Sequence, residues 1–364
     1  MRLEPRASVT PVMLLAAPLG AVAAALLLSG LLIAMSGAPV LEAYRRIVIG
    51  AFGSKLSITE TLTRATPLIL TGLAAATAFR ARLWNIGGEG QFYLGALAAA
   101  TLGAGSLGAG SIGAGSIGAA SGLQLPAPVL ILVVMAAGAL AGMAVLLVPL
   151  ALRLRFGVDE VVTTLLLNFV VLLFVSMMID GPLKDPMAFG WPQSVHVAPA
   201  AVLPKLVAGT RLHIGFAIAV LVSVAVWALQ TYSVFGLEAR AAGVNPRAAA
   251  FAGVSLPYIL LRVACLSGGL AGLAGAIEVL GVKTYVTTDL SPGFGYSGIV
   301  VAMLAGLNPL GVVLSALFVA TMFVGVDSMS RALHVPSFIA DVTVSMSLLT
   351  MLVALLLVSY RIRR

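Results

Sequence analysis

Charged side chains are scarce in this chain of 364 residues. Asp, Glu, Lys and Arg make up 9% of the sequence, whereas hydrophobic residues make up 60% and the mean hydropathy is +1.11. An average soluble domain has about 25% charged residues, so this chain has too few charges to cover a soluble surface. The composition therefore excludes a soluble domain and predicts an all-α integral membrane protein, because its apolar runs have the length of membrane-spanning helices.

Cysteine and histidine are also rare. Cys265 is the single cysteine, so an internal disulfide is excluded, and its place in an apolar run indicates a packing role. The three histidines, His196, His213 and His334, fall at the expected external margins. They form neither a His-Glu-x-x-His motif nor an evident pairing with serine. The sequence thus predicts no catalytic residue, no metal site and no cofactor.

The net charge of +8 comes mostly from basic residues in short segments between apolar runs. This distribution differs from the solvated basic face of a nucleic-acid-binding protein, so no nucleic-acid partner is expected. A bilayer core of roughly 30 Å needs about 20 apolar residues as helix. By that measure we expect about ten crossings, several of them short or broken, near residues 11–35, 62–79, 88–102, 127–150, 159–179, 213–230, 257–279, 296–306, 309–327 and 338–358.

The arginines predict the orientation of these crossings. With a cytoplasmic amino terminus and an even number of crossings, most short arginine-bearing segments lie inside, as the positive-inside rule requires. These segments hold Arg80, Arg82, Arg153, Arg155, Arg240, Arg247 and the closing Arg361, Arg363 and Arg364. The exceptions are Arg45, Arg46, Lys55 and Arg64, which would lie outside. A partly interfacial segment around residues 42–60, which also holds Glu42 and Glu60, would accommodate them.

Residues 103–122 repeat a Gly-Ala-Gly-Ser pattern with little drift. Gly103, Gly108 and Gly113 each begin a formal Gly-x-Gly-x-x-Gly match, but the strand, helix and acidic residue of a dinucleotide site are missing around them. Low complexity of this kind is typical of a flexible loop, which the topology places outside.

A polar, glycine-broken stretch from Asn85 to Gln91, with the sequence NIGGEGQ, lies between two membrane-compatible runs. Irregular backbone at membrane depth must be sheltered by protein or line a wet cavity. Asn85, Glu89 and Gln91 are therefore candidates for the substrate pathway, since intramembrane ionisable groups are usually functional. The alternative is structural: Asn85 caps a helix and Glu89 occupies its first turn.

Three further polar residues are pathway candidates. Thr164 and Asn168 are four residues apart on one helix and share a face, and Asn168 lies about 13 Å into the membrane from Asp159. An amide at that depth needs another helix or a polar solute as its partner. Glu278, near the outer end of the 257–279 run, is expected either to pair with Lys283 or to contact entering substrate. In that run, Gly268 and Gly272 have the spacing of close helix packing.

The insert at residues 236–253 is longer than a simple connector requires. Its pattern predicts a short helix, a turn from Gly243 to Pro246, and a second helix that Asn245 caps and Pro246 begins. Its size suggests a docking surface for a cytoplasmic partner, with an ordinary solvated loop as the alternative.

Together, residues 85–91, the segment 159–168 followed by 181–186, and the insert resemble the permease subunits of bacterial ABC importers. The chain is most similar to the nucleoside-type branch of the ribose and branched-chain amino acid permease group, over about residues 58 to 358. Gly88, where relatives often have alanine, and the Gly-Ala-Gly-Ser repeat depart from the pattern.

The resemblance implies a single multi-pass permease domain over residues 1–364 in the bacterial plasma membrane. Its expected partners are a separate ABC ATPase, a second permease subunit that is identical or different, and a substrate-binding lipoprotein or periplasmic protein. The insert then corresponds to the segment that couples to the ATPase, through Glu238, Ala239, Arg240, Gly243, Asn245 and Pro246. Transport would proceed by alternating access, with ATP hydrolysis in the other subunit.

Few ionisable groups are expected within the membrane, which favours a neutral, hydroxyl-rich solute such as a nucleoside. Ribose or another sugar is the second choice, and a branched-chain amino acid would need a carboxylate partner that the sequence does not place. An ion-coupled secondary carrier using Glu89 and Asp341 is a competing class. A passive channel is another, although it leaves the insert without a role.

Overall fold

The computed structural model describes residues 2–5, 27–28, 30–31, 33–35, 37–105, 126–334, 342, 345–346, 349–350, 353 and 360–363. The chain divides into two compact units: Ala65–Ala316, and Met1–Arg64 together with Leu317–Arg364. The described elements are helices apart from one short antiparallel pair, in which β1 (Arg2–Pro5) pairs with β2 (Tyr360–Arg363). The expected all-α membrane fold is confirmed, and six of the described helices are long and apolar enough to cross a membrane.

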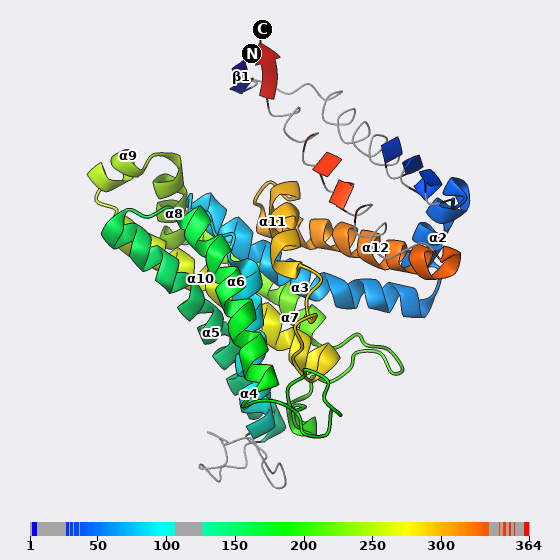
Figure 1. Cartoon of the computed structure of the whole chain (residues 1–364). Coiled ribbons are helices and arrows are strands. Elements are labelled where there is room, and N and C mark those ends of the chain that lie inside the picture. The colour runs from blue at the N-terminus through cyan, green and yellow to red at the C-terminus, as the bar shows by residue number, and fades with distance from the viewer. Residues whose placement is uncertain are drawn as a thin grey trace. The chain divides into compact units, whose positions relative to one another are not determined.

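The larger unit is built around α10 (Leu256–Glu278), which packs most extensively against α5 (Ala127–Phe156) and α4 (Gly88–Gly105). Figure 1 shows α5, α6 and α10 running alongside one another. Glycines allow this close approach: a Cβ built on Gly272 would lie 2.3 Å from the carbonyl oxygen of Gly138, and one on Gly275 would lie 1.9 Å from that of Phe92. The predicted packing role of the small-residue face is therefore confirmed.

The outer helices of this unit are α6 (Glu160–Asp180) and α7 (Gly215–Tyr232), and both expose large apolar side chains, as lipid-facing helices do. α10 continues into a π-helical turn, η2 (Val279–Lys283), and the long segment between α6 and α7 holds a 3-10 turn, η1 (Pro199–Ala201). The short α11 (Phe294–Leu304) follows, and α12 (Pro309–Leu333) begins after a turn at Gly306. An 11-residue helix spans only about 16 Å, so α11 cannot cross a bilayer alone.

The smaller unit contains α2 (Val40–Phe52), the start of α3 (Lys55–Arg80) and the end of α12. α2 packs closely on α12, because a Cβ on Gly50 would lie 2.3 Å from the Cβ of Ser328. Arg64 joins α3 to α12 through an ion pair with Asp327 at 2.6 Å.

The expected spans between residues 62 and 327 all coincide with helices, but some boundaries were wrong. α3 begins at Lys55 rather than 62, because the Ser54 hydroxyl accepts the Ser57 backbone N–H at 3.0 Å and caps its start. α5 continues past 150 to Phe156. Residues 103–105, expected in the external loop, belong to α4, and the rest of that loop lies outside the described residues. The spans near 11–35 and 338–358, with Asp341, also lie largely outside them.

Candidate functional site

The chain leaves helical conformation between α3 and α4, over residues 81–87, where the sequence predicted a break. Arg82 adopts a positive φ of 52°, which turns the chain back toward the helices. The backbone groups of this segment find protein partners: the Gly87 N–H donates to the Asn85 side chain at 3.0 Å, and the Ile86 N–H donates to the Thr164 hydroxyl at 3.2 Å. Side chains therefore shelter the irregular backbone, as a membrane environment requires.

Asn85 and Gln91 form a reciprocal pair of amides at the centre of this site. The Asn85 Nδ2 donates to Gln91 Oε1 at 2.9 Å, and the Gln91 Nε2 donates to Asn85 Oδ1 at 2.8 Å. Asn85 Nδ2 also donates to the Ser267 hydroxyl of α10 at 3.0 Å, and that hydroxyl donates to the Ala74 carbonyl of α3 at 2.8 Å. One chain of hydrogen bonds thus joins the break, α4, α10 and α3.

Asn168 attaches α6 to the same break. Its side chain is fully buried, its Oδ1 accepts the Gly90 N–H at 2.8 Å, and its Nδ2 donates to the Ile86 carbonyl at 3.0 Å. The same amide donates to the hydroxyl of Tyr296 on α11 at 3.1 Å. One turn earlier on α6, the Thr164 hydroxyl receives the Ile86 N–H. Thr164 and Asn168 therefore lie on one face of α6, as their spacing predicted.

Glu89 lies where the amino ends of α4 and α11 meet. Its Oε2 accepts the backbone N–H of Gly295 at 2.7 Å, and the Ser291 hydroxyl and the Tyr296 N–H also bond to this carboxylate. The helices touch closely, because a Cβ on Gly295 would lie 2.2 Å from the Glu89 backbone nitrogen. A carboxylate is well placed at this point, since two helix amino ends carry positive partial charge.

Five of the six predicted pathway residues therefore lie in one buried network, which joins the break at residues 81–87 to α3, α4, α6, α10 and α11. They are Asn85, Glu89, Gln91, Thr164 and Asn168. Glu278 is separate: it is buried at the last position of α10, eleven residues or about 16 Å along the helix from Ser267. In this conformation the network residues bond to protein groups, and their contact with a solute stays a prediction.

The sequence analysis missed the α11 side of this network. Ser291, Gly295 and Tyr296 supply partners for Glu89 and Asn168, yet none of them was singled out as polar machinery. The available signal was the Ser-Pro-Gly-Phe-Gly sequence at residues 291–295, because a Pro and Gly cluster before a short apolar run marks a broken helix.

The insert at residues 236–253 forms two helices, α8 (Val234–Val244) and α9 (Pro246–Phe251). Asn245 lies between them, and its Oδ1 accepts the Ala248 N–H at 3.1 Å while Pro246 begins α9. The predicted capping pattern is therefore confirmed, but the turn expected from Gly243 to Pro246 was wrong in extent: α8 continues through Val244, and only Asn245 leaves the helical conformation. Gly243, near the end of α8, lies against the carboxyl end of α3, where a Cβ would come within 2.1 Å of the Arg80 carbonyl oxygen.

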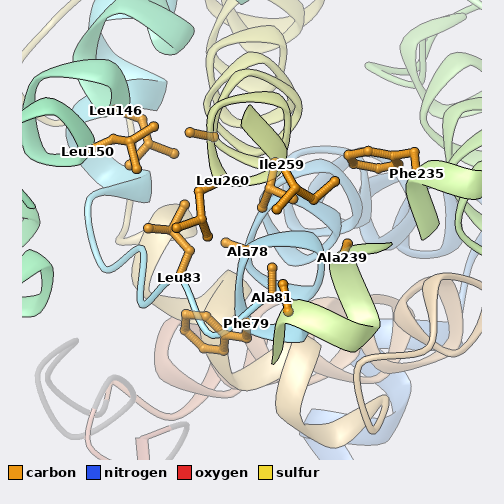
Figure 2. Packing of buried hydrophobic residues seen from close by; sticks show 13 residues of the cluster. Ala78, Phe79, Ala81, Leu83, Leu146, Leu150, Phe235, Ala239, Ile259 and Leu260 are labelled. Carbon is orange, nitrogen blue, oxygen red and sulfur yellow. The ribbon is translucent and has the colours of Figure 1, made fainter. Parts of the chain in front are cut away.

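α8 is fixed to the larger unit through an apolar face. Phe235, Ala239 and Ala242 are buried in one cluster with residues of α3, α5 and α10. Figure 2 shows Phe235 and Ala239 facing this cluster, near Ile259 and Ala81. Close packing therefore holds α8 against these helices.

The opposite side of the insert is exposed. Val244 is 77% exposed and Phe251 is 97% exposed, and Arg240 and Arg247 also face outward. Glu238 is half-buried on α8. Two large apolar side chains with adjacent arginines on a protruding segment are typical of a surface that binds another protein.

Comparison with known proteins decides the family. Residues 57–359 match the family of permease components of branched-chain amino acid transport systems. The chain belongs to this permease family. It is 33% identical to the guanosine ABC transporter permease protein NupP of Bacillus subtilis, over 334 residues that cover 91% of each chain. No solved structure matches the permease.

Two other relatives differ in the solute that they are named for. The permease is 32% identical to the glucose ABC transporter permease protein TsgB13 of Haloferax volcanii, over 100% of this chain and 93% of the relative. It is 29% identical to the nucleoside ABC transporter permease protein NupB of Lactococcus lactis, over 90% and 87% of the two chains. The resemblance inferred from the three motifs is therefore confirmed, and the chain is a multi-pass membrane permease of the ABC type.

Proposed function

We propose that this permease is one of two transmembrane subunits of an ATP-driven importer that carries nucleosides across the plasma membrane. The observation that carries this proposal is the 33% identity to a guanosine permease over 91% of both chains, together with the similarity to a nucleoside permease. The buried network supports it, because amides and hydroxyls are the groups that bind a neutral, hydroxyl-rich solute.

The partners follow from the division of labour in such importers. A separate ATPase supplies the energy and binds the exposed side of α8 and α9, and a substrate-binding protein delivers the solute from outside. Exposed Phe251 and Val244 support the ATPase contact, because burying a large apolar side chain stabilises an interface by about 1.5–3 kcal/mol. The buried face of α8 then passes the movement to α3, α5 and α10.

Solute passage requires the network at the break to change partners. In the conformation described above, the Asn85 and Gln91 amides bond to each other. A nucleoside offers hydroxyls and base heteroatoms of similar hydrogen-bonding strength, so exchange of partners costs little free energy if every group stays satisfied. The proposed transport cycle alternates between this closed network and a state in which the solute replaces one of its members.

A sugar is the second candidate substrate, because the glucose permease matches at 32% identity over the whole chain. Reconstitution with the cognate ATPase and binding protein distinguishes the two. We expect ATP-dependent uptake of labelled guanosine that excess unlabelled nucleoside suppresses and glucose does not. Uptake of glucose without uptake of any nucleoside would replace the proposed substrate and leave the importer assignment intact.

A further inference from the structure

Helix α2 in the smaller unit has features that the transport function does not explain. It has 13 residues, so it is about 20 Å long and cannot cross a bilayer core of roughly 30 Å. Its side chains nevertheless divide into three distinct faces. A short helix with separate apolar and charged faces, attached to a membrane protein, is typical of a helix that lies in the membrane interface.

The first face packs on protein. Ala43, Ile47, Gly50 and Ala51 are buried and lie within about 100° of one another around the helix, at about 100° per residue. This face contacts α12: a Cβ on Gly50 would meet Ser328, and a Cβ on Gly325 would lie 2.5 Å from the Ile47 carbonyl oxygen. The orientation of α2 within its unit is therefore fixed.

The second face is an outward apolar stripe. Leu41, Val48 and Phe52 are 85%, 61% and 56% exposed. They lie within about 40° of one another and about 130° from the centre of the packed face. Three large apolar side chains aligned at one angle, on a helix whose packed face is already occupied, need an apolar environment outside the described protein.

The third face is charged. Glu42 pairs with Arg46 at 2.8 Å and with Arg45 at 3.5 Å, so one carboxylate serves two guanidinium groups and this face keeps a net positive charge. The Glu42 contacts involve Nε of Arg46 and one terminal nitrogen of Arg45, whereas each guanidinium has five N–H donors. Exposed Lys55 follows shortly afterwards, at the start of α3. Phosphate is the complement of such a fork of donors.

From these faces we infer that α2 lies in the plane of the membrane interface and binds anionic phospholipid. The stripe of Leu41, Val48 and Phe52 enters the acyl boundary. Arg45, about 40° from the centre of the stripe, and Arg46, which shares the Glu42 carboxylate with it, bind the lipid phosphate on the charged face. The net positive charge of the charged face, which holds Glu42, Arg45 and Arg46, selects an anionic lipid over a zwitterionic one. A second permease subunit on the stripe is the competing occupant, and the test below distinguishes the two.

The depth of the stripe is measured on the full chain in nanodiscs. In a Cys265→Ser background, an environment-sensitive fluorophore is attached at Val48→Cys or at Ile49→Cys. Ile49 is the matched control, because it is also apolar and 44% exposed but lies among the charged residues, about 80° from the centre of the stripe. We expect spin-labelled lipid to quench the label at 48 strongly and the label at 49 weakly, with the reverse order for aqueous iodide.

The charge selectivity is measured as the affinity of the same chain for short-chain phosphatidylglycerol against phosphatidylcholine. We expect Arg45→Gln and Arg46→Gln each to weaken phosphatidylglycerol binding about fivefold. The control variant Lys205→Gln, in the segment between α6 and α7, should leave that affinity unchanged. Equal quenching at 48 and 49 in monodisperse single chains would overturn the interfacial placement. Protection of position 48 only when a second permease is present would assign the stripe to that subunit, and unchanged lipid affinity in both arginine variants would overturn the phosphate site.

Discussion

Replacement of Asn168 by leucine tests whether the buried network holds the broken segment in place. Leucine has a similar volume but cannot form the three hydrogen bonds of the Asn168 side chain. Loss of the Asn168 amide leaves the Gly90 N–H, the Ile86 carbonyl and the Tyr296 hydroxyl without the hydrogen bonds that this amide makes. The sequence left open whether the Asn168 amide serves another helix or a polar solute. The contacts of Asn168 with protein groups predict that stability falls together with uptake.

The expected loss follows from the number of bonds. Interhelical hydrogen bonds in membrane proteins average about 0.6 kcal/mol, so three of them contribute roughly 2 kcal/mol. Leaving two buried backbone groups unsatisfied raises the upper end of the loss to about 5 kcal/mol. A loss of roughly 2 kcal/mol lowers the folding equilibrium about 30-fold.

Denaturant titration and uptake are measured on one preparation of the assembled transporter. The control is Thr163→Val, because the Thr163 hydroxyl bonds to the Asp159 carbonyl of its own helix end and joins no second helix. We expect Asn168→Leu to lose stability and uptake together, and Thr163→Val to keep both. Normal stability with abolished uptake would instead place Asn168 in direct contact with the solute.

Three further predictions concern other regions. Burial lowers the pKa of His213, in the loop before α7, to about 4. Between pH 4 and 6.5 the unfolded chain therefore binds more protons than the folded chain. The free energy of unfolding should therefore fall by on the order of 3 kcal/mol as the pH is lowered from 6.5 to 4. Denaturation measured across this pH range should show a weaker pH dependence for His213→Asn, whereas the control His196→Asn, at an exposed site, should leave it unchanged. Phe251→Ser should insert normally but reduce ATPase co-purification at least tenfold, and full co-purification would remove Phe251 from the docking surface. An impermeant thiol reagent should label Lys205→Cys in intact cells and Arg247→Cys only in opened ones; labelling of position 247 in intact cells would invert the topology.

Local patterns predicted much of the fold. The apolar runs located α3 to α7 and α10 to α12, because burial in lipid demands runs of apolar residues regardless of tertiary context. Asn245 and Pro246 predicted the start of α9, since capping depends on neighbours within one turn. The start of α3 at Lys55 escaped this reasoning, because Glu60 and Arg64 make that end polar. Their charges are accommodated in an ion-pair cluster with Asp327, which is distant in sequence.

The site was predictable in its members and not in its connections. The break and the polar residues on α6 were visible because polar groups at membrane depth are costly. Their pairing was not, because Asn85 bonds to Ser267 of α10 and Glu89 bonds to the amino end of α11, about 200 residues away along the chain. The bond from Gly295 to Glu89 depends on the close approach of the two helix ends, which Gly295 allows because it has no side chain. A single sequence does not reveal which helix ends will meet.

The most direct test of the proposed function is nucleoside uptake by reconstituted transporter. The permease, its partner permease, the ATPase and the binding protein are placed in proteoliposomes, and uptake of labelled guanosine is followed with ATP and with a non-hydrolysable analogue. The account predicts concentrative uptake with ATP and none with the analogue. The uptake with ATP should disappear when this chain is omitted. Equal uptake with the analogue, or concentrative uptake without this chain, would contradict it.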